Sequence, residues 1–171
     1  MAHDRVISVV SLLMVLCALT GCQTVGRQGM TTMAEFVVEV DANGHYGLAF
    51  PVHNSTSQVL QLPVWHVSGL VIVSLQADGR EVPPHPGGVS VGEEDPRMRS
   101  VDPGEQYGYV LSVHTGRVVA SRPRAEDEAK LGFVSYSIPP NWQTLQFGYA
   151  VLDRSNGALF CRNTVRFHRY K

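Results

Sequence analysis

The chain has 171 residues, with 14 Lys and Arg against 15 Asp and Glu, and its formal net charge is −1. This length predicts one main domain with room for a hydrophobic core. A nucleic-acid-binding surface needs clustered basic residues that attract phosphate, so the near-neutral charge argues against a nucleic-acid partner.

Residues 1–21 have the layout of a secretory signal peptide. Arg5 supplies a basic start, an apolar run extends from Val6 to Ala18, and small residues precede Cys22. The apolar run is too short to span a membrane, because a spanning helix needs about 20 apolar residues. We therefore predict a cleaved leader and not a permanent transmembrane anchor.

The leader ends in Leu19-Thr20-Gly21-Cys22, which resembles the lipobox of bacterial lipoproteins. In that family a diacylglycerol is attached to the cysteine thiol, and the peptide bond before the cysteine is cleaved. The resemblance implies that Cys22 is the lipid attachment site and the first residue of the mature protein. Gln23, in place of Asp, resembles the sorting pattern for the Gram-negative outer membrane. The expected location is therefore the cell outer membrane, on its periplasmic or surface face.

Residues 22–33 predict a lipidated N-terminus and a flexible tether, because they show no hydrophobic period and include glycines. Of the three cysteines, Cys17 belongs to the leader and Cys22 carries the expected lipid, which leaves Cys161 in the domain. We expect no intramolecular disulfide and a buried, inert Cys161 thiol. A reactive thiol, or one paired with another chain, is the alternative.

Residues 34–171 predict a single β domain. Short runs rich in Val, Leu, Ile, Phe and Tyr are separated by turn residues at intervals of about ten, without strand-helix-strand units. This pattern favours an all-β fold, an antiparallel β-sandwich of seven to eight strands. The predicted strands are Glu35–Val40, Tyr46–His53, Gln58–Leu62, Leu70–Gln76, Gln106–Val113, Gly132–Ile138, Gln146–Leu152 and Leu159–Phe167.

Three connecting segments carry further signals. Asn156-Gly157 predicts a hairpin with a type I′ turn, which needs two residues that tolerate positive φ. Ser121 can cap one short helix that ends at Gly132, but the segment has almost no apolar face, so we favour a single surface turn. Residues 83–104 are rich in Pro and Gly and predict a long irregular loop, the expected place for a contact surface.

Gly88-Val89-Ser90-Val91-Gly92 matches the G-x-S-x-G nucleophile motif of hydrolases. That motif requires a strand before the serine and a helix after it. Here Pro and Gly precede the motif and an acidic run with a proline follows it, so neither flank fits. We predict no catalytic residues and no enzymatic activity.

The sequence evidence for metal binding is similarly weak. Of the seven histidines, His3 lies in the leader, and no two of the others have the i, i+2 or i, i+4 spacing that places two imidazoles on one face. Cross-strand approach of His45 or His53 to His114 is possible. We predict no metal and no other cofactor.

The segment from Tyr46 to Val113 contains the turn Asn54-Ser55-Thr56, a hairpin at Asp78-Gly79, and the step Val101-Asp102-Pro103-Gly104-Glu105. It resembles bacterial immunoglobulin-like β-sandwich domains with an N-x-T turn and a P-G-E step, including the family of the Bacillus intracellular proteinase inhibitor. The resemblance implies an immunoglobulin-like sandwich. It also raises protease inhibition by the loop 83–92 as a second function.

The leading interpretation is a lipid-anchored envelope protein that acts as a non-catalytic binding or accessory module. Its expected partners are membrane lipid, through Cys22, and an envelope protein. The two tryptophans lie beside turns, where such residues are core plugs or surface anchors. We expect partner contacts at Pro86 and Gly88 in the loop 83–104, and at Trp142.

Overall fold

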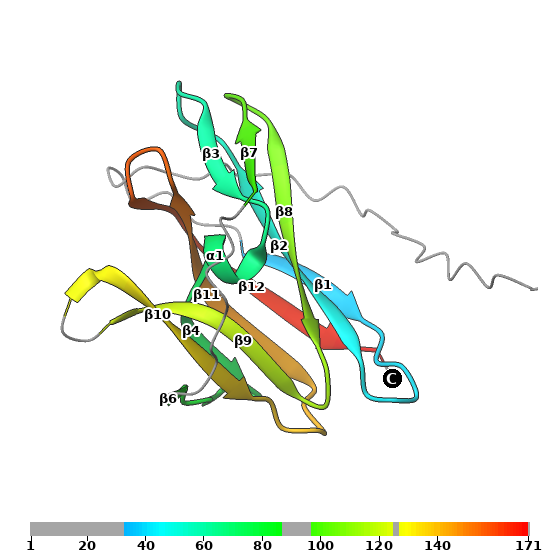
Figure 1. Cartoon of the computed structure of the whole chain (residues 1–171). Coiled ribbons are helices and arrows are strands. Elements are labelled where there is room, and N and C mark those ends of the chain that lie inside the picture. Colours follow the sequence, from blue (N-terminus) through cyan, green and yellow to red (C-terminus); the bar gives the residue numbers. More distant parts are fainter. Residues whose placement is uncertain (1–32, 87–96, 125–126, 171) are drawn as a thin grey trace, which may run out of the picture.

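The computed structural model describes residues 33–86, 97–124 and 127–170 (Figure 1). Within these ranges the fold is all-β, as predicted, and the one helix is the single turn α1 (His66–Gly69). The twelve described strands are β1 (Ala34–Val38), β2 (Tyr46–His53), β3 (Leu60–Pro63), β4 (Leu70–Ala77), β5 (Arg80–Glu81), β6 (His85–Pro86), β7 (Met98–Val101), β8 (Gln106–Val113), β9 (Arg117–Arg124), β10 (Asp127–Ser137), β11 (Thr144–Asp153) and β12 (Ala158–Arg169).

The larger sheet has eight strands in the order β1-β12-β11-β4-β9-β10-β6, with β5 paired to β4. The sheet is mixed. The first strand, β1, runs parallel to the last, β12, and β4 runs parallel to β9 where Val71 pairs with Ser121. The prediction of a purely antiparallel arrangement is therefore wrong for these two pairs, which join strands far apart in the sequence.

Two small sheets, β2-β8 and β3-β7, pack against the larger sheet and enclose one hydrophobic core with it (Figure 1). Phe50 of β2 is fully buried. Its ring lies 5.3 Å from the rings of Phe147 and Tyr149 in β11 and 5.7 Å from that of Phe167 in β12. These edge-to-face contacts hold the layers together, since each buried aromatic side chain contributes about 1.5–3 kcal/mol.

Polar contacts join the layers at the end of β11. The buried carboxylate of Asp153 accepts hydrogen bonds from the backbone N–H of Gln61 in β3, at 3.2 Å, and of Ser155, at 3.0 Å. The N–H of Arg154 donates to the carbonyl oxygen of Gln61 over 2.9 Å. The turn after β11 therefore also secures β3.

Strand positions follow the predicted runs closely, and β2 and β8 have the predicted bounds. The helix or surface turn predicted after Ser121 is wrong. The chain there forms the antiparallel pair β9 and β10, with Val118 and Ala120 of β9 in the core. The short strands β5, β6 and β7 lie within or beside the Pro-rich stretch, and they raise the strand number above the predicted seven to eight.

The hairpin at Asn156-Gly157 is confirmed, but its turn type is not. Gly157 alone in the turn 154–157 has a positive φ, of 71°. Type I′ geometry, with two positive φ values, occurs instead at Asp78-Gly79 and at Thr115-Gly116. The latter connects β8 to β9 directly.

Candidate functional site

Some of the sites predicted from the sequence lie in the described part of the chain, and others lie outside it. Cys22 and Gly88 lie outside the described residues, as does most of the loop 83–92. Pro86 belongs to β6, which pairs with β10 through Val134 and Pro86. The lipid site and the inhibitory loop thus stay predictions.

Trp142 is a core residue, only 1% exposed. Its ring lies 5.4 Å from that of Tyr46, and the guanidinium group of Arg169 lies 6.0 Å from its centre. Desolvation by burial raises the pKa of Tyr46 to about 12. A side chain so enclosed offers no surface, which corrects the prediction of a partner contact at Trp142.

The exposed tryptophan is Trp65, at 40% of its surface. Val64, which precedes it in the chain, and Met98, in the strand β7 that pairs with β3, are also exposed apolar residues. Two neighbouring segments bring the three together, since Pro63 pairs with Met98 and the N–H of Val64 donates to the carbonyl oxygen of Arg97 over 2.7 Å. We call Val64, Trp65 and Met98 the apolar patch.

The backbone beneath the apolar patch is anchored on both sides of Trp65. The buried hydroxyl of Tyr109 in β8 donates to the carbonyl oxygen of Pro63 over 2.8 Å. In the turn α1, the buried hydroxyl of Ser121 in β9 donates to the carbonyl oxygen of Val67 over 2.5 Å. Gly69 leaves room for Tyr109, because a Cβ there would lie 2.2 Å from the tyrosine oxygen.

His66 follows Trp65 directly and is partly buried. Desolvation by burial lowers the pKa of this imidazole below its usual value of about 6.5. The neutral form of His66 is therefore favoured next to the patch. Sequence reasoning missed the patch, although a tryptophan after Pro63 was its visible signal.

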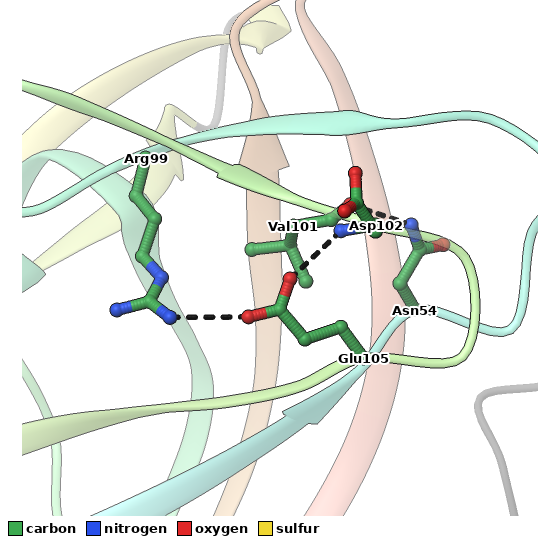
Figure 2. Close-up of polar contacts among 5 residues, drawn as sticks. All are labelled: Asn54, Arg99, Val101, Asp102 and Glu105. Atoms are coloured by element: carbon green, nitrogen blue, oxygen red, sulfur yellow. Dashed lines mark hydrogen bonds and ion pairs between the residues drawn. The ribbon is translucent and has the colours of Figure 1, made fainter.

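Two of the motifs behind the family resemblance, the turn at Asn54 and the step from Val101 to Glu105, meet at a second location (Figure 2). Asn54 is fully buried, and its amide nitrogen donates to the carbonyl oxygens of Gln58, at 2.8 Å, and Val101, at 2.9 Å. Its amide oxygen accepts from the N–H and hydroxyl of Thr56. The backbone of Asn54 also accepts from Gly104 N–H. All polar atoms of the Asn54 side chain are engaged in structural contacts.

Glu105 extends this network toward the surface. Its carboxylate accepts from the N–H of Asp102 at 2.9 Å and from Arg99 at 3.1 Å (Figure 2). The hydrogen bond from the Asp102 backbone, followed by that from Arg99, lowers the pKa of Glu105. The Arg99 guanidinium also lies 5.0 Å from the ring centre of Tyr107. These contacts stabilise the corner between the two small sheets.

Cys161 is buried, as predicted, and lies at a bulge in β12 with a φ of 54°. It is also disulfide-bonded. The expectation of a domain without an intramolecular disulfide therefore does not hold for this structure.

Two features are absent from the described residues, a metal-binding cluster of three or more side chains and a membrane-spanning helix. No group of three or more His, Cys, Asp and Glu side chains is arranged there to hold a metal ion. No helix in the described ranges is long and apolar enough to cross a membrane. Comparison of the chain with protein-family models, curated proteins and solved structures finds no match.

Proposed function

We propose that the protein is a lipid-anchored, non-catalytic binding module of the cell envelope, and that it contacts a protein partner through the apolar patch. The lipobox ending in Cys22 supports the anchor, and residues 22–33 supply the tether. The mixed two-layer β fold, with its first and last strands paired, supports an immunoglobulin-like sandwich as the anchored domain.

The exposure of Trp65 on a backbone segment that also carries exposed Val64 and neighbours exposed Met98 is the observation that carries the binding role. Tryptophan and methionine are enriched in protein interfaces, and truncation of a central tryptophan typically costs the most binding energy. Met98 also belongs to the stretch 83–104, where the sequence predicts a contact surface. The patch therefore joins this stretch to the turn before α1.

The anchored backbone strengthens the proposal. Tyr109 and Ser121 hold the carbonyl groups on either side of Trp65, so the indole is presented from a fixed main chain. A preorganised contact loses less conformational entropy on binding than a flexible one. A patch built in this way suits a specific partner better than nonspecific adhesion.

Affinity isolation from detergent-solubilised envelopes tests the proposal. Trp65→Ala should remove a partner that co-purifies with the wild-type chain, while Val37→Ala, at an exposed position of β1, should retain it. Thermal unfolding of both variants checks that the domain is intact. Retention of every co-purifying protein by a folded Trp65→Ala, Met98→Ala double variant would contradict the binding role of the patch.

A further inference from the structure

Two histidines that are 69 positions apart in the sequence face each other at the end of the β2-β8 sheet. Tyr46 pairs with Val113, and the next residues outward are His45 and His114. Their ring centroids are 4.6 Å apart, with an angle of 67° between the ring planes. Both side chains are accessible to solvent, and His45 is 41% exposed.

Tight turns hold the backbone on both sides of the pair. In the first turn, the Asp41 carboxylate accepts from the N–H groups of Asn43 and His45, each at 2.8 Å. In the second turn, Thr115-Gly116 has type I′ geometry, and the N–H of Arg117 donates to the carbonyl oxygen of His114 over 3.0 Å. The two imidazoles are thus presented from fixed positions.

We propose that His45 and His114 together chelate one divalent transition-metal ion. Two imidazole nitrogens bound to one tetrahedral ion at about 2.0–2.1 Å place the ring centroids about 5 Å apart, close to the spacing observed here. Imidazole suits zinc and copper, whereas magnesium and calcium prefer oxygen ligands. Water completes the coordination, since the pair is exposed.

Asp41 places a negative charge beside His45. Its second carboxylate oxygen lies 3.8 Å from Nδ1 of His45. This distance is too long for a hydrogen bond, but the carboxylate charge beside the ring attracts a cation bound there. The protein supplies only two ligands, so the other coordination positions of the ion are open to water. This inference is independent of the apolar patch, because it uses residues at another part of the fold.

Calorimetric titration of the purified full chain with Zn²⁺ tests the inference. The wild type should bind Zn²⁺ at this pair, and His45→Ala and His114→Ala should each weaken that binding by at least about tenfold, the scale on which even outer-shell partners change metal affinity. Mg²⁺ should show no comparable binding. Circular dichroism confirms that each variant is folded.

His168→Ala is the matched control. His168 is similarly exposed, at 42%, and also lies beside a carboxylate, with its Nε2 3.5 Å from Glu35. Unlike His45 and His114, it is not packed against a second histidine ring within the described part of the chain. This variant should bind Zn²⁺ like the wild type. The proposal is overturned if His45→Ala and His114→Ala both fold and bind Zn²⁺ with wild-type affinity. It is also overturned if the wild type does not bind Zn²⁺.

Discussion

The side-chain amide of Asn54 donates a 2.9 Å hydrogen bond to the carbonyl oxygen of Val101, a residue 47 positions further along the chain. This contact closes the corner at which β2 leads toward β3 and β7 leads toward β8. Asn54 and the Val101 carbonyl are shielded from water there, so neither has an alternative partner in solvent.

Asn54→Ala should therefore destabilise the fold. It leaves the carbonyl oxygen of Val101 without its amide donor, and a buried polar group without a partner costs about 1–3 kcal/mol. Urea unfolding should show this loss as a lower midpoint. Asn43→Ala, in an exposed turn, is the control and should stay within about 0.5 kcal/mol of the wild type. Equal stability of the two variants would contradict a structural role for Asn54.

Phe50→Ala should be among the most damaging single substitutions. It removes three aromatic contacts between the layers and leaves a cavity, at a typical cost of about 3–5 kcal/mol. The free energy of unfolding measures the effect. Val110→Ala, at an exposed position of β8, should change it by about 0.5 kcal/mol or less. A loss near 1 kcal/mol for Phe50→Ala would argue against tight packing between the layers.

Gly116→Ala and Gly157→Ala form a matched pair, because both glycines have a φ of 71°. Alanine in this left-handed region costs about 1–2 kcal/mol. A Cβ on Gly116 would also lie 2.9 Å from the carbonyl oxygen of Ile138, whereas nothing lies within 4 Å of one on Gly157. Gly116→Ala should therefore be the more destabilising in thermal unfolding. The reverse order would contradict the close approach of Ile138.

His66 should make stability depend on pH. Burial lowers its pKa in the folded state, so below the unfolded value of 6.5 the unfolded chain binds more protons at this residue. The contribution of His66 to stability is thus complete above that pH and declines as the pH falls through 6.5. His66→Gln should flatten the curve of unfolding free energy between pH 8 and pH 5. If His66→Gln leaves the slope of unfolding free energy against pH unchanged, the pH dependence does not come from His66.

Lipidation of Cys22 makes a prediction about location. Cys22→Ser should move the chain from the membrane fraction to the soluble fraction, while Cys17→Ser should leave it anchored. Intact mass should show the added diacylglycerol in the wild type and in Cys17→Ser, but not in Cys22→Ser. Lipidation consumes the Cys22 thiol and cleavage removes Cys17, so lipidation and the Cys161 disulfide exclude each other within one mature chain. Peptide mapping without reduction distinguishes the two forms, and the lipid anchor predicts the lipidated one. Membrane retention of Cys22→Ser would contradict the anchor.

The all-β class, most strand positions and the burial of Cys161 in the last strand could be predicted from the sequence alone. Each of these follows from local information. Alternating side chains point to opposite faces of a strand, and turn residues adopt their backbone geometry whatever lies around them. β9 escaped prediction because its charged and proline-containing end suggested a capped helix or surface turn.

Only the tertiary structure decided which segments lie side by side. It placed β1 parallel to β12, buried Trp142 while exposing Trp65, and brought His45 against His114. Both tryptophans follow turns and look alike in the sequence, so their neighbours decided their exposure. The physical reason is that pairing and burial depend on contacts between residues far apart in the chain, which local hydrophobic periodicity does not encode.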